Sequence, residues 1–353
     1  MVKPRSGLGL RSGYYSPQLD VEVRLNSNES SESLPEGFYQ RLNQRVREVQ
    51  INRYPDRSYH QVREALAERD GVSPQEVFAG NGSNEVLQTI CLGFAGSGRT
   101  ALVVEPTYAM HSQIARNTGA NVEIRFRRNT HELTVGEYGN MLDEVQPDLT
   151  FLCSPNNPTG ESLSSELLQV AASSEDRLVV FDEAYVEFSS KPWTRAELPN
   201  VVQTRTFSKA FAMAGARFGY CIAVPETIAV LDEVVLPYHL DSLKQALVLT
   251  SLDFIEQAES AVAEVIARRD ILSRSMTELG LDVYPSDANF ILVDFGEIDG
   301  NRIWEELVSA SVLVRNCTSW PGLGNCLRIT AGTEVEHERL LEALSRALVV
   351  VGS

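Results

Sequence analysis

Three side chains that could act together in covalent and acid–base chemistry follow two apolar segments of the sequence. Asp182 ends the run Leu178–Phe181 and Tyr185 comes three residues later, while Lys209 follows the run Val201–Thr204. Both runs have the composition of strands buried in a parallel sheet, and ligands bind beyond the carboxyl ends of such strands. A lysine at that edge can be desolvated and nucleophilic, so the two segments predict a reactive site.

Each of these residues also has a purely structural interpretation. Asp182 could cap the helix that follows it, with Tyr185 packed beneath, and most lysines are solvated surface cations. The surroundings of Lys209 favour chemistry, because Ser208 precedes it, apolar residues flank it and Arg217 lies eight residues further on. A hydroxyl, a lysine and an arginine together suit an aldehyde that carries a phosphate.

Two further polar segments are predicted at the same edge of the sheet. Residues 79–85 contain two glycines and precede a helix predicted over Glu85–Phe94. Glycines at a helix N-terminus expose amide groups that bind phosphate. The segment Ser154–Gly160 follows the predicted strand Leu149–Cys153 and offers the amide of Asn157. Glycine-rich turns are common, but the ordered set indicates a single site.

Pyridoxal phosphate has four requirements that this set meets. It needs a lysine for its aldehyde, a carboxylate for its ring nitrogen, donors for its phenolic oxygen, and cations or amide groups for its phosphate. Asp182 would keep the ring nitrogen protonated. Lys209, displaced by the substrate, would then be free to carry the substrate α-proton. The sequence therefore predicts an enzyme with pyridoxal 5'-phosphate as its cofactor.

The elements that would position these residues form an α/β pattern. Short runs rich in Val, Ile and Leu alternate with helical patterns, which favours a large doubly wound, mostly parallel sheet. The runs that fit strands best are Thr100–Val104, Leu149–Cys153, Leu178–Phe181, Val201–Thr204 and Gly219–Ala223. We expect the large cofactor-binding domain to cover residues 36–241, after an irregular N-terminal arm over residues 1–35.

A second, smaller α+β domain is predicted over residues 242–353. A helical pattern runs from about residue 242 to 279, and strands are predicted at Phe290–Val293 and Leu327–Thr330. A last helix is predicted from residue 334 to about 349. The long first helix would connect the two domains.

Composition excludes several classes of protein. The 353 residues carry a net charge of −17 and no run of five basic residues, which argues against nucleic acid as a partner. The five cysteines form no Cys-x-x-Cys pair and the five histidines have no ligand spacing, so we expect no metal and a reducing compartment. Without a signal peptide or an apolar run of eighteen residues, the chain is expected in the cytoplasm and not in a membrane.

The motifs and their order resemble the fold-type I pyridoxal phosphate aminotransferases, and among them the histidinol-phosphate aminotransferase branch, over nearly the whole chain. The segments that carry the resemblance are Arg24–Glu29, Asn52–Pro55, Gly80–Glu85, Pro106–Tyr108, Ser154–Gly160, Asp182–Tyr185, Arg205–Phe211, Ala214–Arg217 and Cys326–Thr330. One segment departs from the family, which usually continues Asn-Glu-Asn-Pro where this chain has Asn-Glu-Ser-Ser at residues 28–31. The departure bears on substrate preference more than on cofactor or fold.

The resemblance implies a role for each site residue. Lys209 would form the imine with the cofactor, Asp182 would pair with its ring nitrogen, Tyr108 would stack on the ring, and Asn157 with Tyr185 would bind its phenolic oxygen. The cofactor phosphate would be held by Ser83, Asn84, Ser208, Arg217 and, from the second subunit of a homodimer, Tyr54. The substrate would contact Tyr14, Asn84, Tyr238, Arg315 and Arg328.

The implied reaction transfers an amino group between histidinol phosphate and 2-oxoglutarate, with glutamate as the other product, in histidine biosynthesis. Three alternatives stay open. An aromatic amino-acid aminotransferase could use the same arginines, because arginine binds a carboxylate as readily as a phosphate. A pyridoxal phosphate decarboxylase of amino-acid phosphates would share the cofactor site. A regulatory domain without activity is the third, and the intact Lys209 and the lack of an appended DNA-binding segment argue against it.

Overall fold

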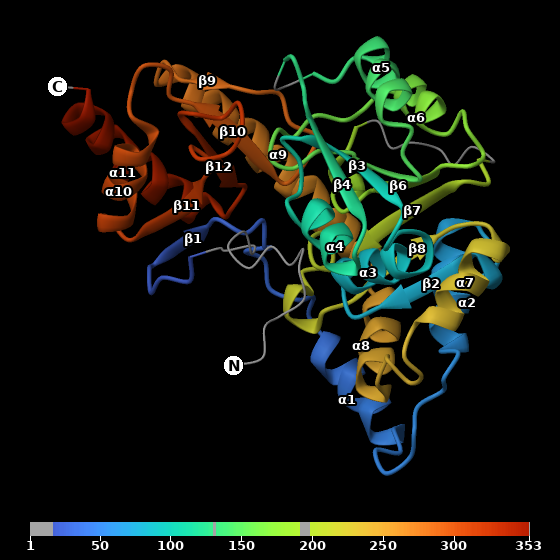
Figure 1. The fold of residues 1–353 in the computed structure, drawn as a ribbon. Coiled ribbons are helices and arrows are strands. Elements are labelled where there is room, and N and C mark those ends of the chain that lie inside the picture. Colours follow the sequence, from blue (N-terminus) through green and yellow to red (C-terminus); the bar gives the residue numbers. More distant parts are fainter. Residues whose placement is uncertain (1–16, 130–131, 191–197, 353) are drawn as a thin grey trace, which may run out of the picture.

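The computed structural model describes residues 17–129, 132–190 and 198–352, which fold around two β-sheets (Figure 1). The larger sheet has seven strands in the order β2-β8-β7-β6-β5-β3-β4. Strands β3 to β7 pair in parallel, whereas β8 is antiparallel to both of its neighbours. The strands are β2 (Val77–Gly80), β3 (Thr100–Glu105), β4 (Asn121–Phe126), β5 (Leu149–Cys153), β6 (Leu178–Asp182), β7 (Val201–Thr206) and β8 (Gly219–Ile222).

Helices cover both faces of the larger sheet. One face packs against α3 (Ser83–Phe94), α4 (Met110–Thr118) and α7 (Pro225–Val234), and the other against α5 (Val135–Val145) and α6 (Ser165–Ala171). Side chains of a strand point alternately to its two faces, so β3 contributes Ala101 and Val103 to the first cluster and Leu102 and Val104 to the second. The predicted doubly wound, mostly parallel α/β sheet is thereby confirmed.

The smaller sheet has five strands in the order β1-β11-β12-β10-β9. The strands are β1 (Val23–Leu25), β9 (Asp282–Val283), β10 (Phe290–Asp294), β11 (Val312–Asn316) and β12 (Cys326–Thr330), and helices α10 (Gly300–Ser309) and α11 (Glu334–Val351) pack on them. Strand β1 lies beside β11 although it belongs to the segment that was expected to be an irregular arm (Figure 1). Three residues are too short to show a strand pattern in sequence, so only the pairing with β11 reveals this one.

The remaining helices are α1 (Phe38–Glu48), α2 (His60–Asp70), α8 (Ser242–Leu252) and α9 (Ile255–Glu278), with 3₁₀ turns at Pro74–Glu76, Val186–Phe188 and Ala214–Ala216. The single helix predicted over residues 242–279 is wrong, because the structure has two helices that meet at Asp253 and Phe254. Asp253 accepts hydrogen bonds from Arg41 and Arg45 of α1. The ring of Phe254 packs on Phe38 of the same helix. The two residues between α8 and α9 therefore both contact α1.

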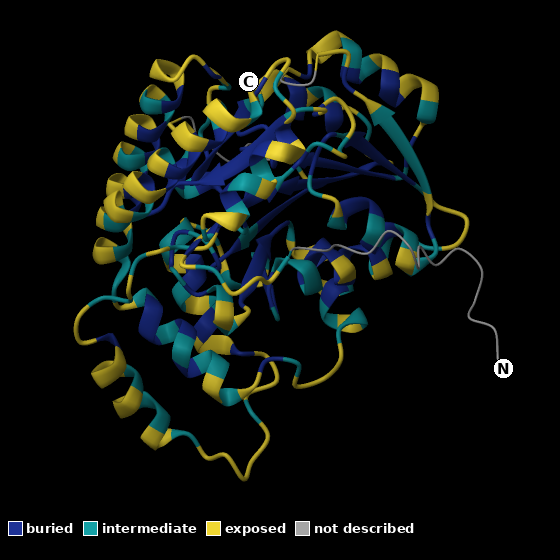
Figure 2. Cartoon of the chain, turned by 90° about the vertical axis from the view of Figure 1, so that its left-hand side faces the viewer, coloured by how far each residue is buried: buried dark blue, intermediate teal, exposed yellow. Residues whose placement is uncertain are grey.

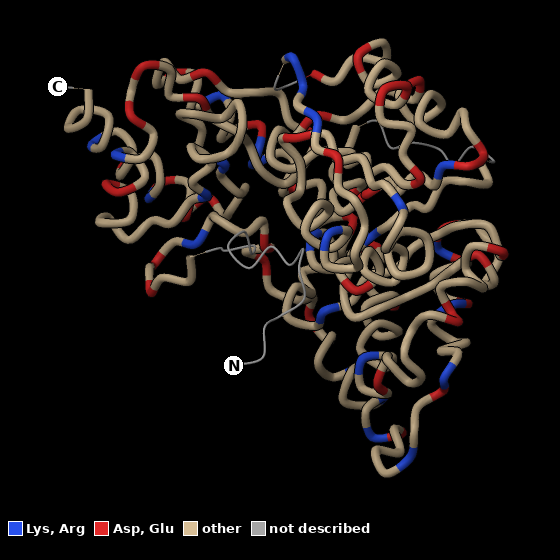
Figure 3. Tube along the Cα trace, viewed as in Figure 1, with Lys and Arg blue, Asp and Glu red and all other residues tan. Residues whose placement is uncertain are grey.

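Most strands of both sheets are buried and the outward faces of the surrounding helices are exposed (Figure 2). All five cysteines are buried free thiols. Acidic and basic residues are interspersed along the chain (Figure 3). In the described part of the chain, no helix is both long and apolar enough to cross a membrane.

Strand β1 gives a test of how firmly the start of the chain is attached. Leu25 is fully buried in the core of the smaller sheet, whereas Arg24 points to the exposed face. Replacing a buried leucine by alanine removes apolar contacts and leaves a cavity, at a cost of about 2–5 kcal/mol. We expect Leu25→Ala to lower the free energy of unfolding by about that amount in urea denaturation, and Arg24→Ala to change it little. Equal effects of the two substitutions would show that β1 is not anchored through Leu25.

Candidate active site

A cavity of about 470 Å³ opens at the carboxyl edge of the larger sheet, where the sequence placed the reactive residues. Nine of the predicted cofactor residues line it together: Ser83, Asn84, Tyr108, Asn157, Asp182, Tyr185, Ser208, Lys209 and Arg217. They come from the ends of β2, β3, β5, β6 and β7 and from the loop before β8. Chain order reverses between β3 and β5, and such a switch point is the usual ligand site of an open α/β sheet.

Lys209 lies beyond the end of β7 with its amine directed into this cavity. The amine donates a hydrogen bond to the carbonyl oxygen of Ser27, at 2.9 Å. Burial lowers the pKa of Lys209 to about 7, the nearby guanidinium groups of Arg328 and Arg217 lower it as well, and Glu29 opposes them. A large fraction of the amine is therefore neutral near pH 7, which is the form that reacts with carbonyl groups.

Asp182, at the end of β6, is held from two sides. One carboxylate oxygen accepts a hydrogen bond from the amide of Ala184 at 3.2 Å. The other lies 2.9 Å from Nε2 of His111, a fully buried residue of α4 whose ring stacks on Phe151 and meets the edge of Tyr108. The contact fixes the carboxylate in one orientation at the floor of the cavity.

Tyr185 is the centre of a second set of hydrogen bonds. Its hydroxyl accepts from the side-chain amides of Asn28 at 2.9 Å and Asn157 at 3.4 Å. Burial raises the pKa of Tyr185 well above its ordinary value, so the phenol stays protonated at neutral pH. Asn157 in turn accepts from Arg328, whose other nitrogen donates to the carbonyl of Asn26 at 2.7 Å.

A set of donors suited to a phosphate surrounds the start of α3. The helix begins after Gly82 without a side-chain cap, which leaves its first amide groups available to an anion. Arg217 donates to the hydroxyl of Ser208 at 3.2 Å, on the neighbouring loop. Gly219 lies directly behind Ser83, because an added Cβ would come within 2.3 Å of the Ser83 nitrogen. Only glycine lets the two backbones approach this closely.

Three other predicted residues, Tyr54, Tyr238 and Arg315, do not line the cavity of the single chain. Tyr54 and Tyr238 stack on each other elsewhere, with ring centroids 4.6 Å apart. Arg315 lies on β11 directly opposite Arg328 of β12, with its guanidinium 5.4 Å from the ring centroid of Trp320. Tyr14 lies outside the described residues. Of the predicted substrate residues that the structure describes, Asn84 and Arg328 line the cavity.

Three residues that the sequence did not assign to the site belong to it by position. His111 contacts Asp182, Asn28 contacts Tyr185, and Glu29 lines the cavity. His111 stands three residues after Tyr108, a spacing of about one helical turn that could have placed it beside the cofactor. Asn28 and Glu29 belong to one of the motifs that carry the family resemblance, but tertiary contacts, including the pairing of β1 with β11 and a hydrogen bond from Asn28 to Thr330, bring that motif to the cavity.

Comparison with known proteins identifies the family to which the chain belongs. The sequence model of the family described as aminotransferase class I and II matches residues 21–344. The histidinol-phosphate aminotransferase of Paenarthrobacter aurescens is 38% identical over 357 residues, which is 98% of this chain and 94% of the relative. That of Frankia casuarinae is 40% identical over 369 residues, covering 99% of this chain and 91% of the relative.

Solved structures share the fold. The histidinol-phosphate aminotransferase of Sinorhizobium meliloti, in complex with pyridoxal-5'-phosphate, superimposes with a TM-score of 0.86 at 23% identity, over 94% of this chain and 91% of that one. A double mutant of Thermus thermophilus aspartate aminotransferase gives 0.78 at 24% identity, over 92% of this chain and 91% of that one.

The lowered pKa of Lys209 can be measured by chemical labelling. Neutral amines react with acetic anhydride and charged ones do not, so we expect the labelling of Lys209 in cofactor-free protein to rise with a midpoint near pH 7. For an ordinary lysine the midpoint lies at about pH 10.4. The chain has four lysines, Lys3, Lys191, Lys209 and Lys244, so peptide mapping can follow each one. A midpoint for Lys209 near that of an ordinary lysine would contradict the proposed desolvation.

Proposed function

Because the chain belongs to the family of class I and II aminotransferases, we propose that it transfers the amino group of histidinol phosphate to 2-oxoglutarate, with pyridoxal 5'-phosphate as its cofactor. The reaction belongs to histidine biosynthesis and yields glutamate as the second product. The observation that carries the proposal is the meeting of Lys209, with its lowered pKa, and Asp182 in one cavity of a class I and II aminotransferase fold. An amine and a carboxylate in this arrangement supply what the cofactor needs at its two reactive ends.

The residues of the cavity fit pyridoxal phosphate. Its phosphate would be held by the first amide groups of α3, by Ser208 and by Arg217. The absence of side chains at Gly82 and Gly219 shapes this cradle, because an added Cβ at Gly82 would lie 2.6 Å from a guanidinium nitrogen of Arg217. The same substitution at Gly219 would push against the backbone of α3. The two glycines thus leave space beside the first amide groups of α3 that a phosphate group could occupy.

The remaining groups would orient the cofactor ring and move the proton. Asp182, fixed by His111, would hold the protonated ring nitrogen, and Tyr185 with Asn157 would bind the phenolic oxygen. When bound, the cofactor acts as an electron sink for the negative charge left by the departing α-proton. The neutral amine of Lys209 can accept that proton, and its pKa near 7 suits both uptake and return at neutral pH.

The phosphate of the donor is recognised by a pair of arginines. Arg315 and Arg328 are direct neighbours across the antiparallel β11–β12 pair, so their side chains leave the sheet on the same face. Both are buried, and like charges placed directly opposite each other are unfavourable. The hydrogen bonds of Arg328 shown above go to neutral acceptors. A dianion beside the pair would be attracted by both guanidinium groups, and histidinol phosphate supplies one where an amino acid has only a carboxylate.

We propose further that the chain acts in the cytoplasm as a homodimer in which Tyr54 reaches the cofactor phosphate of the other subunit. Helix α1 and the loop after it project from one end of the molecule (Figures 1 and 2). Exposed apolar side chains gather there and on the loop before α8, including Ile51 (74% exposed), Tyr54 (81%), Leu236 (77%) and Tyr238 (41%). An exposed apolar patch of this kind is typical of a surface that is covered in an oligomer.

Donor selectivity tests the role of the arginine pair. Each charge-assisted hydrogen bond to the phosphate contributes about 1.5–3 kcal/mol, and 1.4 kcal/mol is a factor of ten. We expect Arg315→Ala to lower kcat/KM for histidinol phosphate by about tenfold or more, and kcat/KM for phenylalanine much less. Steady-state assays with 2-oxoglutarate as acceptor measure both donors.

Arg302→Ala is the matched control for this experiment, because Arg302 is an exposed arginine on the helix α10 that packs on the same sheet. It should leave both donors unchanged. The cofactor affinity of Arg315→Ala should equal that of the wild type, since Arg315 does not line the cavity. Equal losses for the two donors, or a wild-type enzyme that prefers phenylalanine, would favour an aromatic amino-acid aminotransferase instead.

Mixed dimers test whether Tyr54 acts across the subunit boundary. In a dimer of a Tyr54→Phe chain and a Lys209→Ala chain, one site combines native Lys209 with native Tyr54 of the other chain. That site should bind the cofactor as the wild type does. In a dimer of a wild-type chain and a Tyr54→Phe, Lys209→Ala double variant, the one site with a lysine meets only phenylalanine, and its affinity should be about tenfold weaker or more.

Two affinity tags allow both mixed dimers to be purified, and cofactor titration of each gives the comparison. The two dimers contain the same substitutions in the same number, so general effects on stability are matched. The reverse order of affinities would place Tyr54 in its own subunit's site, and equal affinities would remove it from the cofactor phosphate.

A further inference from the structure

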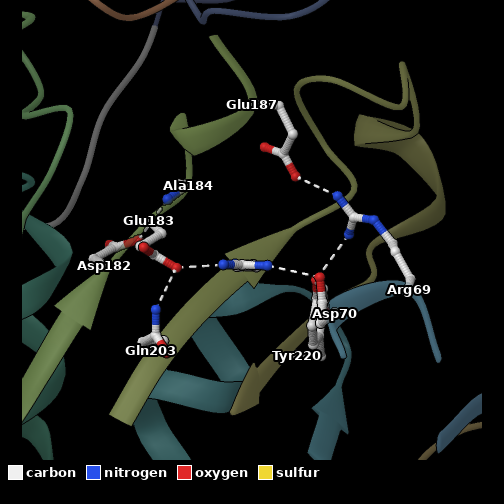
Figure 4. A network of polar contacts seen from close by, with 9 residues as sticks. Arg69, Asp70, Asp182, Glu183, Ala184, Glu187, Gln203 and Tyr220 are labelled. Carbon is white, nitrogen blue, oxygen red and sulfur yellow. Dashed lines mark hydrogen bonds and ion pairs between the residues drawn. The ribbon is translucent and has the colours of Figure 1, made fainter. Parts of the chain in front are cut away.

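The reverse face of the larger sheet carries buried charged side chains directly behind the candidate site (Figure 4). Asp182 and Glu183 are consecutive in the chain, so their side chains point to opposite faces of the sheet. Glu183 continues the pairing of β6 with β7, because its amide donates to the carbonyl of Thr204 at 2.8 Å. Its carboxylate is completely buried on the reverse face. The candidate site lies on the opposite face, which carries Asp182 and is called the front face here.

Arg205, on β7, joins this carboxylate to helix α2. Its Nε donates to Glu183 at 2.9 Å and its Nη1 donates to Asp70, the last residue of α2, at 2.7 Å. Gln203, on the same face of β7, donates to the same oxygen of Glu183 at 3.1 Å. One guanidinium group therefore ties the ends of β6 and β7 to the end of a helix.

Arg69, which precedes Asp70 in the chain, makes a second junction. It donates to Glu187 at 3.1 Å and to the hydroxyl of Tyr220 at 2.8 Å, and that hydroxyl donates to Asp70 at 2.7 Å. Its guanidinium carbon lies 4.9 Å from the ring centroid of Phe211. Arg205 thus binds Asp70 directly and Arg69 is joined to it through the Tyr220 hydroxyl, so the two arginines belong to one continuous network.

The network brackets the residues that face the cavity. Tyr185 lies in the chain between the two glutamates that the arginines bind, and Asp182 directly precedes the first of them. Lys209 lies between Arg205 and the ring that Arg69 covers. The loop that follows β6 is therefore contacted by Arg205 before Tyr185 and by Arg69 after it, and the loop that follows β7 is contacted by Arg69 after Lys209, all from the reverse face of the sheet.

Stability alone does not account for such a network. Removing buried charges from water costs free energy, and well-packed apolar residues of similar volume often stabilise a fold as much or more. A guanidinium group differs from an apolar side chain in having donors with a fixed planar geometry, which hold two acceptors in defined directions. The network therefore suits a function that depends on position.

We propose that Arg69 and Arg205 are positioning residues, which hold Asp182, Tyr185 and Lys209 in their working arrangement from the reverse face of the sheet. The inference rests on the proposed function, because it concerns the same reactive side chains. A misplacement of about 1 Å can lower a catalytic rate by about 100-fold. The arginines need not touch substrate or cofactor to have an effect of that kind.

The test compares Arg69→Met and Arg205→Lys with Arg63→Met. Arg63 is a matched control, because like Arg69 it lies over an aromatic ring, that of Tyr59, and pairs with a carboxylate, that of Asp232 at 2.5 Å. These two partners lie outside the loops that follow β6 and β7. Arg205→Lys keeps the charge and loses the fork that joins two carboxylates. Three quantities are measured for each variant: kcat and KM, the thermal midpoint of unfolding, and the pH midpoint of acetic anhydride labelling of Lys209 in cofactor-free protein.

We expect kcat to fall by about tenfold or more in Arg69→Met and Arg205→Lys with KM little changed, because the loss is one of orientation. A loosened loop exposes Lys209 to water, so its labelling midpoint should rise by roughly one pH unit toward the ordinary lysine value. Arg63→Met should lower the thermal midpoint without moving kcat or the labelling midpoint.

The proposal is overturned if both variants lose thermal stability as Arg63→Met does while kcat and the labelling midpoint stay at their wild-type values. The network would then support the fold alone. Labelling requires neither substrate nor cofactor, so it decides the positioning role even if the enzyme proves to use another donor. A fall in kcat with an unmoved labelling midpoint in both variants would also count against it, because Lys209 would not have been displaced.

Discussion

The amine of Lys209 is held out of bulk water close to two guanidinium groups, and much of the surrounding structure maintains that unfavourable position. Burial together with Arg328 and Arg217 lowers its pKa to about 7. In the unfolded chain the same amine binds a proton far more tightly, so folding is less favourable at every pH below the ordinary lysine value. The core elsewhere must offset this cost. In return, the chain has an amine that is both nucleophilic and basic at neutral pH.

The site lies where the two sheets meet, and the start of the chain joins them. Strand β1 pairs in the smaller sheet, and the residues after it then contact the reactive groups one after another. The carbonyl of Asn26 accepts from Arg328, that of Ser27 accepts from Lys209, and the side chain of Asn28 donates to Tyr185. A movement of the smaller sheet relative to the larger one would therefore alter the contacts that residues 27 and 28 make with Lys209 and Tyr185. Arg328 lies on β12 of the smaller sheet, so the contact that such a movement would alter is its hydrogen bond to Asn157. The position of strand β1 therefore affects the positions of the side chains that face the cavity.

The two faces of the sheet at the end of β6 carry carboxylates in different surroundings. On the front, Asp182 meets His111 and the cavity, and on the reverse Glu183 meets an arginine network. Alternation along a strand places these neighbouring carboxylates in separate environments. Both are buried, yet one is available to a ligand and the other is occupied by Arg205. A single peptide step thus separates a carboxylate that faces the cavity from one that is bound by the arginine network.

The sequence by itself determined the α/β fold, the cofactor and most of the polar residues that line the candidate cavity, because apolar runs and the polar residues that end them are local patterns. The residues Asp182 and Lys209 could be placed at one edge from strand direction alone. Tertiary structure decided the rest: the pairing of β1, the break between α8 and α9, the contact of His111 with Asp182 and the opposition of Arg315 and Arg328. These features join residues far apart in the chain, and no local pattern encodes which distant partner a side chain will meet. The burial that lowers the pKa of Lys209 is likewise a property of the assembled sheets, and it exists only once they are packed together.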